Sequence, residues 1–129
     1  MKKLVFILLA LTLFATMLVG CAPSAGLNAH NTSIAQMSIN ALDDYIDGKI
    51  DARTTIETTA EIRNEIDLNE KEDNDVDAAR QLSLLINDAG LILVPVALGD
   101  EEKIENLNEL LRIRNQIARL AGLDTRRSV

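Results

Sequence analysis

The sequence is short of the residue types from which most catalytic and metal sites are built. It holds no tryptophan, a single cysteine and a single histidine among 129 residues. A zinc cluster needs several such ligands, and a di-iron centre in a helical bundle needs Glu-x-x-His pairs. A glycosidase could draw on the many carboxylates, but a small domain with so few aromatic residues is a poor host for a substrate cleft. We therefore expect neither enzymatic activity nor a bound cofactor or metal.

Charge is absent from one long stretch near the N-terminus. Two lysines precede an apolar run from Leu4 to Gly20, and the run ends at Cys21. It lies at the short end of the roughly 17 to 25 residues that a membrane-spanning helix needs. No basic residue closes it, and the "APSAG" that follows does not continue a helix easily, because Pro23 lacks an amide hydrogen. This layout predicts a cleaved signal peptide over residues 1–20.

The letters "LVGC" that end at Cys21 resemble the lipobox of bacterial lipoproteins. The resemblance implies that Cys21 is lipidated on its sulfur with a diacylglyceryl group, that cleavage precedes it, and that an extracytoplasmic lipoprotein begins there. It covers residues 1–21 alone. Ala22 at the next position resembles lipoproteins sorted to the outer membrane, if the host is Gram-negative. In a Gram-positive host, the lipid would lie in the outer face of the cell membrane.

Two physical arguments agree with an acylated cysteine. Two or three acyl chains hold a protein on a bilayer stably, at about 0.8 kcal/mol per buried methylene, whereas one chain does so only marginally. A lone thiol outside the cytoplasm is open to oxidation, and acylation removes it. The alternative is a buried cysteine near the end of a transmembrane helix.

Basic residues are outnumbered in the predicted mature chain. The sequence has 13 Lys and Arg against 20 Asp and Glu, so loss of Lys2 and Lys3 leaves 11 against 20, a balance of −9. Nucleic acid phosphates and anionic headgroups repel such a body. Tyr45 is its single aromatic residue, which is too few for a base-stacking platform. We expect no nucleic acid partner, and contact with the membrane through the lipid on Cys21.

Small and polar residues from Cys21 to Asn31 predict a short, flexible, lipid-anchored tether. His30 falls in this tether. A histidine without fixed partners is a poor ligand or base, so we expect no such role for it. The bundle domain is predicted to occupy residues 32–123, and residues 124–129 form a basic C-terminal tail.

Two helices joined by a short connection are predicted for the first half of this domain. Apolar residues recur after Thr32 at spacings of three and four, which is a helical stripe, and Gly48 ends it. Asp51 caps a second helix that runs to about Leu68, with an alternative start at the capping box that begins at Thr54. We expect the stripe of the second helix to be Ile56, Ala60, Ile62 and Ile66. Because only "DGKI" joins the two helices, they should form an antiparallel hairpin.

Two further helices are predicted for the second half. The third starts within Asp73 to Asp75, and Gly90 offers it an end. The fourth starts at Gly99 or Asp100 and stops at Gly122, which takes the left-handed conformation. Its apolar stripe is Ile104, Leu107, Leu110, Leu111, Ile113, Ile117, Ala118 and Leu120. The fold class that follows is all-α: a small antiparallel four-helix bundle built from two helical hairpins.

The apolar run from Ala89 to Leu98 contains Pro95, which forbids an undisturbed helix. The run is too short to span a membrane. It is either core, as a kinked helix extension or a separate turn, or a surface that faces a partner or lipid. We expect Leu91 and Leu93 to face inward. A proline break leaves groups that a bundle does not fully cover, which defines a candidate partner surface of Val94, Val96 and Leu98.

An acidic stretch suggests a calcium loop at first sight. Asp73, Asp75 and Asp77 match the first, third and fifth ligands of an EF-hand. The sixth position is Ala78 rather than glycine, and the twelfth is Leu84 rather than glutamate. A weak, nonspecific divalent-ion site is the alternative to the reading that we favour, in which these acids begin the third helix.

Charge is also unevenly distributed along the chain. Residues 43–77 are strongly acidic, whereas residues 104–129 hold more arginines than acids. An acidic hairpin and a basic helix that complement each other within the bundle explain this pattern. The alternative is that Arg126 and Arg127, beyond the last helix, meet an acidic partner or lipid headgroups.

These observations favour a membrane-tethered, extracytoplasmic lipoprotein that acts as a non-catalytic protein–protein interaction module in the cell envelope. The expected partner is another envelope or extracellular protein. A lipoprotein that binds a small apolar ligand, or weakly a divalent ion, is the alternative. A large apolar cavity would favour the ligand, and a solid core with an exposed apolar groove would favour the protein partner.

The lipobox interpretation predicts the fate of a Cys21→Ser variant. Without the thiol there is no acceptor for the lipid, so the variant should remain an uncleaved precursor and take up no labelled fatty acid such as palmitate. Metabolic labelling and immunoblotting of membrane fractions measure both outcomes. Mature-length protein at the membrane in this variant would contradict the interpretation.

Overall fold

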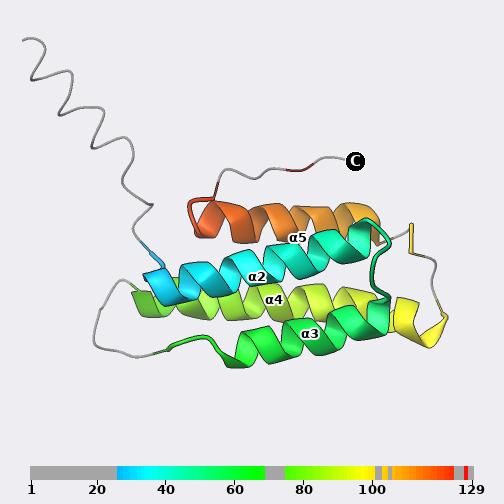
Figure 1. The fold of residues 1–129 in the computed structure, drawn as a ribbon, viewed down its shortest axis with the longest axis horizontal. Coiled ribbons are helices and arrows are strands. Elements are labelled where there is room, and N and C mark those ends of the chain that lie inside the picture. The colour runs from blue at the N-terminus through cyan, green and yellow to red at the C-terminus, as the bar shows by residue number, and fades with distance from the viewer. Residues whose placement is uncertain (1–25, 69–74, 101–102, 105, 124–126, 128–129) are drawn as a thin grey trace, which may run out of the picture.

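The computed structural model describes residues 26–68, 75–100, 103–104, 106–123 and 127. These residues form four helices, labelled in Figure 1: α2 (Ala29–Ile46), α3 (Ala52–Asn64), α4 (Asp75–Leu98) and α5 (Leu107–Leu120). The helices pack against one another, and no strand occurs in the described part of the chain. The predicted all-α four-helix bundle is confirmed.

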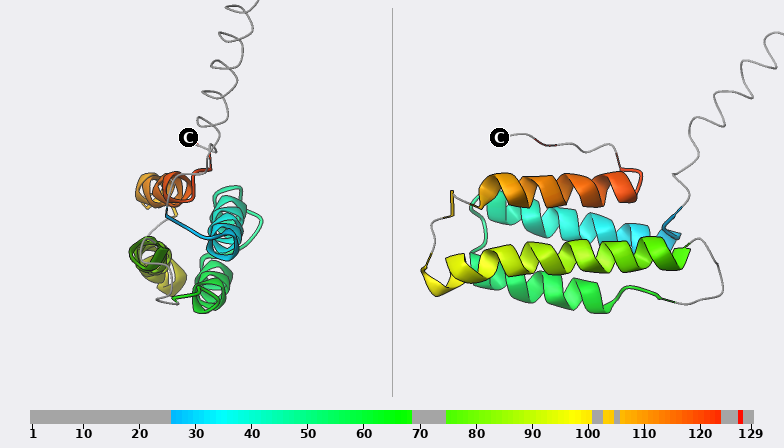
Figure 2. Two further views of the ribbon diagram at one scale, coloured as in Figure 1. Left: turned by 90° about the vertical axis from the view of Figure 1, so that its left-hand side faces the viewer. Right: turned by 180° about the vertical axis from the view of Figure 1, so that it is seen from behind.

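Consecutive helices run in opposite directions. The end-on view in Figure 2 shows the four helices at the corners of a square. Each helix packs on two neighbours: α2 and α4 both contact α3 and α5, whereas α2 and α4 touch only lightly across the diagonal. The α2–α3 and α4–α5 hairpins therefore lie side by side around one core.

Glycine ends three of the described helices in the same way. Gly48, Gly99 and Gly122 have φ of +77°, +78° and +67° and follow the last residues of α2, α4 and α5. After α5, the amide of Leu123 donates to the Ala118 carbonyl at 2.8 Å, which is the longer bond of a Schellman motif. The predicted stops at Gly48 and Gly122 are confirmed. Gly99 was expected to begin the fourth helix but ends α4 instead, because its left-handed backbone cannot continue a helix.

The start of α3 agrees with prediction, whereas the starts of α2 and α5 differ from it. The side chain of Asp51 accepts from the Thr54 amide at 2.7 Å, so Asp51 caps α3 as predicted, and Thr54 lies inside the helix. Asn28 caps α2, which begins at Ala29 rather than Thr32. His30 therefore lies in the first turn of α2 and not in a tether, and its Nε2 is 2.8 Å from the Glu65 carbonyl oxygen.

The start of α5 also lies later than expected. The helix begins at Leu107, with Asn106 at the N-cap, rather than at Gly99 or Asp100. Ile104, predicted to belong to the apolar stripe, lies before the helix and is 76% exposed. Within α5, Leu110, Leu111, Ile113, Ile117 and Ala118 of the stripe are buried, whereas Leu107 and Leu120 are half-buried.

Helix α3 turns a different face to the core than its sequence suggested. Its buried residues are Ala52, Thr55, Thr59 and Ile62, whereas Ile56 and Ile66 are only half-buried. The threonine hydroxyls are satisfied within the helix, since Thr55 donates to the Asp51 carbonyl at 2.7 Å and Thr59 to the Thr55 carbonyl at 2.8 Å. Threonine can therefore be buried at little polar cost. Because the threonine side chain is small, α3 comes close to α4 near Gly90. A Cβ added to Gly90 would lie 3.9 Å from Thr59 Oγ1.

Helix α4 runs unbroken through Gly90 and Pro95. Of the forms expected for the run after Gly90, the structure has the helix extension, so Gly90 does not end α4; α3 packs closely against the helix at this glycine. Pro95 removes one helical hydrogen bond, and the Asn106 side chain donates to the nearby Ile92 carbonyl at 3.3 Å. Leu93 is fully buried as predicted, but Leu91, expected to face inward, is 60% exposed.

An ion-pair cluster joins the two hairpins. Arg114 of α5 is 4% exposed and donates from Nε and Nη2 to the Asp43 carboxylate of α2, at 3.0 and 2.9 Å. Arg127 also reaches Asp43, at 3.2 Å, and it pairs with Asp47. This geometry matches the interpretation in which the acidic hairpin and the basic helix complement each other inside the bundle.

Two asparagine side chains hold segments of irregular backbone against the helices. The buried Asn31 accepts from the Asp67 amide at 2.9 Å and donates to the Asp67 carbonyl at 2.8 Å. Asn115 makes the same pair of bonds with the backbone of Arg127, at 3.0 and 2.8 Å. An amide side chain thus fixes the chain after α3 and the chain after α5.

Leucine truncation at two positions of α4 should separate core from surface. In a soluble chain that begins at Ala22, Leu93→Ala should lower the free energy of unfolding by about 2 to 5 kcal/mol, because it leaves a cavity in a filled core. Leu91→Ala removes an exposed side chain and should cost less than about 0.5 kcal/mol. Urea melts followed by circular dichroism measure both. Equal losses at the two positions would contradict the burial pattern.

The pairing of Arg127 with Asp47 predicts a pH effect. The hydrogen bond from Arg127 lowers the pKa of the Asp47 carboxyl below its ordinary value. A carboxyl with a lowered pKa stabilises the fold above its unfolded pKa, and the contribution is lost as pH falls through the folded pKa. Arg127→Ala should therefore be less stable than the parent at neutral pH, and the difference should shrink on acidification below about pH 4. Melts of both chains across pH test this.

Arg119→Ala is the matched control for this prediction, because Arg119 is an exposed arginine of α5. Its stability difference from the parent should not follow the same acid dependence. A difference for Arg127→Ala that stays constant from neutral to acid pH would count against the pairing.

Candidate functional site

The outer face of α4 exposes large apolar side chains along the helix. Leu84, Leu91 and Leu98 are 64%, 60% and 68% exposed. Because seven residues make almost two helical turns, residues at this spacing lie along one side of the helix. The opposite side of α4 is buried, with Leu82 and Leu93 at 0% exposure. We call the exposed residues Leu84, Leu91 and Leu98 the leucine row.

A groove of about 120 Å³ lies between α3 and α4 next to the leucine row. Its apolar lining includes Ile56, Ala60, Leu91 and Val94. Thr59 and Gly90 also line it, so small residues leave room for a side chain from outside the bundle. At its rim, Arg63 donates to the Asn87 side chain at 2.5 Å. Leu91 both belongs to the leucine row and lines the groove, so the two adjoin at this residue.

Length and composition alone would allow α4 to cross a membrane. The segment Val76–Leu98 passes this test, and it does so alone among the described helices. In the bundle, however, one side of the segment packs into the core formed with α2, α3 and α5. The apolarity of α4 therefore reflects two separate faces, one buried and one exposed.

The predicted partner surface around Pro95 is only partly exposed. Val94 is 38% exposed and Leu98 is 68% exposed, as expected for surface residues. Val96 is half-buried and packs against the core. Their burial differs because α4 continues as a regular helix, so neighbouring residues point in different directions.

The remaining predicted site residues have different outcomes. Cys21 and Arg126 lie outside the described residues. Arg127 is described, and its guanidinium pairs with Asp43 and Asp47 within the bundle rather than extending toward a partner. The charge that it would offer to an acidic partner is therefore largely matched internally.

The acidic stretch gives no metal centre in the described part of the chain. No group of three or more His, Cys, Asp or Glu side chains is placed to hold a metal ion there. Asp73 lies outside the described residues, and Asp75 begins α4. Asp77 lies 3.9 Å from Arg80 on the exposed surface of the same helix.

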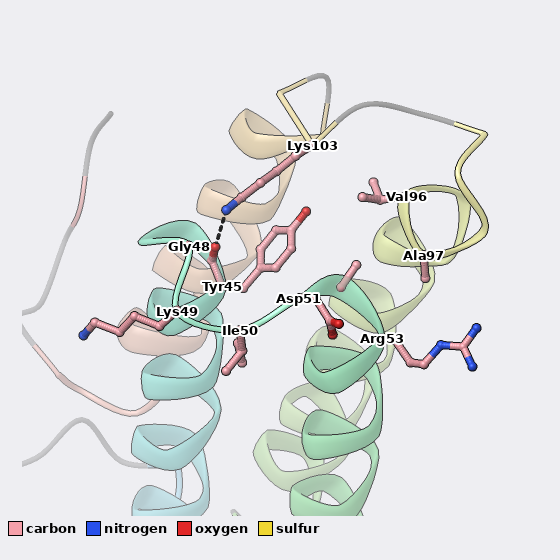
Figure 3. Close-up of a pocket in the computed structure, with 10 residues that line it drawn as sticks. Tyr45, Gly48, Lys49, Ile50, Asp51, Arg53, Val96, Ala97 and Lys103 are labelled. Atoms are coloured by element: carbon pink, nitrogen blue, oxygen red, sulfur yellow. Dashed lines mark hydrogen bonds between the residues drawn. The ribbon is translucent and has the colours of Figure 1, made fainter.

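A second hollow, of about 500 Å³, lies at one end of the bundle. We call it the end cleft. Figure 3 shows that it lies between the α2–α3 connection, the C-terminal part of α4 and Lys103. Apolar side chains on its walls include Ile50, Val96 and Ala97. The cleft is open to solvent.

Tyr45 is the most unusual residue of the end cleft. It is 2% exposed, and its hydroxyl has no hydrogen-bond partner among the described residues. Burial raises the pKa of this phenol, so it is neutral at neutral pH and remains a donor. In Figure 3 the ring points from α2 into the space bordered by Val96 and Lys103.

Lys103 reaches back over this ring. Its Nζ lies 4.6 Å from the ring centroid of Tyr45, which is a cation–π contact, and donates to the Tyr45 carbonyl at 2.6 Å. An ammonium group has three donors, so this bond leaves capacity for an incoming acceptor. Lys103 thereby places positive charge over the ring that carries the buried hydroxyl.

The other charged groups of the cleft are directed elsewhere. Lys49 and Arg53 extend outward on opposite sides in Figure 3. Lys49 lies 3.4 Å from Asp44. Asp51 accepts from the Thr54 amide, and this bond lowers the pKa of its carboxyl. Lys103 is therefore the cation that faces Tyr45 within the described part of the cleft.

Sequence reasoning missed parts of both surfaces. The spacing of Leu84, Leu91 and Leu98 was available as a signal, since residues seven apart lie on one side of a helix. The position of Lys103 above Tyr45 was not available, because it depends on how the α4–α5 connection folds back across the end of the bundle.

Comparison of the chain with protein-family models, curated proteins and solved structures found no match in any of the three.

Proposed function

We propose that the protein is a lipid-tethered, non-catalytic interaction module of the cell envelope, which binds another envelope or extracellular protein through the outer face of α4. The exposed leucine row and the adjoining α3–α4 groove are the observation that supports this function. Several large apolar residues exposed on one side of a helix, next to an apolar groove, are typical of a surface that meets a partner. The lipid on Cys21 would keep the bundle next to the membrane.

The shape of the surface favours a helical partner. A row of leucines beside a groove lined by Thr59, Ala60 and Gly90 suits an amphipathic helix, whose apolar side chains recur at spacings of three, four and seven. Leu91 and Val94 flank the groove and would lie next to such a helix. The partner is therefore expected to present an amphipathic helix.

A protein partner is favoured over the bilayer itself. The predicted mature chain has a balance of −9, which disfavours close contact with anionic headgroups. A small apolar ligand inside the bundle is less well supported, because the core is filled by side chains such as Leu42, Ile86 and Ile117 that are at most 1% exposed. The filled core with an external groove is the combination expected of an interaction module.

Site-specific photo-crosslinking in the native host tests this function. With a photoreactive amino acid at Leu84 or Leu91, the lipidated protein should form one discrete adduct with a second protein in the envelope. The same amino acid at Met37, which is 47% exposed on α2, should not form this adduct. Immunoblots and mass spectrometry identify the product.

Three results would redirect or overturn the proposal. An adduct with twice the mass of the protein would indicate self-association through α4. Crosslinks to phospholipid alone would indicate a bilayer-facing surface. Equal crosslinking at Leu91 and Met37 would show that the leucine row is not a specific site. Substitution of Leu84 by Glu should remove the adduct formed at position 91 while the circular dichroism spectrum is unchanged.

A further inference from the structure

A buried hydroxyl without a partner distinguishes the end cleft from the rest of the described bundle. The other buried polar side chains, such as Asn31, Thr55 and Arg114, are hydrogen-bonded. Tyr45 alone among the described residues has a buried side-chain oxygen with no partner. Leaving a buried donor unsatisfied costs about 1 to 3 kcal/mol, and a ligand that accepts from it removes that cost. We therefore expect a ligand of the end cleft to carry a hydrogen-bond acceptor for this hydroxyl.

Lys103 specifies the charge of that acceptor. Its ammonium group lies over the same ring and keeps donors in addition to the one directed at the Tyr45 carbonyl. A neutral phenol and a cation at one site together favour a group that is both anionic and an acceptor. A carboxylate satisfies both donors.

The walls of the cleft specify the rest of the ligand. In Figure 3, Val96 of α4 lies across the cleft from the Tyr45 ring, and Ala97 and Ile50 also contribute apolar lining. A hydrated or highly polar molecule would lose its water against these walls without replacement bonds. A short aliphatic chain attached to the carboxylate would instead bury apolar area there.

We propose that the end cleft binds a small aliphatic carboxylate, whose carboxylate accepts from the Tyr45 hydroxyl and the Lys103 ammonium and whose alkyl chain lies against Val96 and Ala97. The end cleft shares no lining residue with the α3–α4 groove of the proposed function. It lies where α2 ends and α3 begins, whereas the described chain enters α2 at the opposite end of the bundle (Figure 1). The 18 residues of α2, at about 1.5 Å each, place roughly 27 Å between the two ends.

Hexanoate is the probe, and Tyr45 itself is the reporter. The chain has one tyrosine and no tryptophan, so its tyrosine fluorescence arises at the proposed site alone. Titration of the lipidated protein in maltoside detergent with hexanoate should change this fluorescence saturably and raise the melting temperature. Hexan-1-ol and hexylammonium, which have the same alkyl chain without the anion, should bind at least about tenfold more weakly.

Substitutions separate the two donors from the fold. Lys103→Met and Tyr45→Phe should each weaken hexanoate binding about tenfold, measured for Tyr45→Phe by the shift in melting temperature. Lys49→Met is the matched control, because Lys49 borders the cleft but extends away from it, and it should bind hexanoate within about twofold of the parent. Without ligand, Tyr45→Phe should melt no lower than the parent, because the hydroxyl lacks a partner.

Three results would overturn this proposal. The absence of a saturable response to hexanoate at millimolar concentrations would exclude the site. Equal binding of hexan-1-ol would show that the carboxylate is not recognised. A lowered melting temperature of ligand-free Tyr45→Phe would show that the hydroxyl is already bonded in the free protein. Because the end cleft shares no lining residue with the groove at Leu91, each of these results leaves crosslinking at Leu91 unaffected.

Discussion

Burial of aliphatic side chains along one shared axis is the interaction on which the bundle depends. The largest fully buried apolar side chains come from α2, α4 and α5 and include Ile39, Leu42, Leu82, Ile86, Leu93, Leu110, Ile113 and Ile117. Each contributes on the order of 1.5 to 3 kcal/mol when buried. No helix covers its own stripe, and each packs on two neighbours. The helices are therefore stable together rather than singly, since isolated helices as short as α3 and α5 are marginal in water.

Polar groups then fix how the helices are joined. Arg114 links α5 to Asp43 of α2 through two hydrogen bonds, a geometry that only a correctly placed guanidinium can make. Asn31 and Asn115 hold irregular backbone through paired amide bonds. These contacts define which loop lies beside which helix, a question that nondirectional apolar packing leaves open.

Two surfaces remain after the core has been filled, and they differ in kind. The α4 surface is extended and apolar, and small residues of α3 and α4 deepen it into a groove. The end cleft is compact, with an unpartnered phenol under a cation. The first suits a helix from another protein, and the second suits a small anion. Both arise from α4, whose length exceeds that of its neighbours and whose last turns continue past Pro95.

Much of the architecture was readable because helix formation is governed by short-range patterns. Three- and four-residue apolar spacing indicated the helices, Asp51 indicated the start of α3, and Gly48 and Gly122 indicated helix ends, since each depends on neighbours within one or two turns. The same local reasoning failed at Gly90 and Gly99. A glycine by itself does not say whether the chain turns there, because packing against α3 keeps Gly90 helical.

The sequence by itself determined the helical class, the hairpin order and the acidic character of the domain, because periodicity, short connections and charge are properties of the chain. Only the tertiary structure decided which side of α4 is buried and that Thr55 and Thr59, rather than Ile56, face the core. It also decided that Arg127 returns to Asp43 and that Lys103 lies over Tyr45. These contacts join residues far apart in sequence, and their partners are set by how four helices pack around one core, which no local pattern specifies.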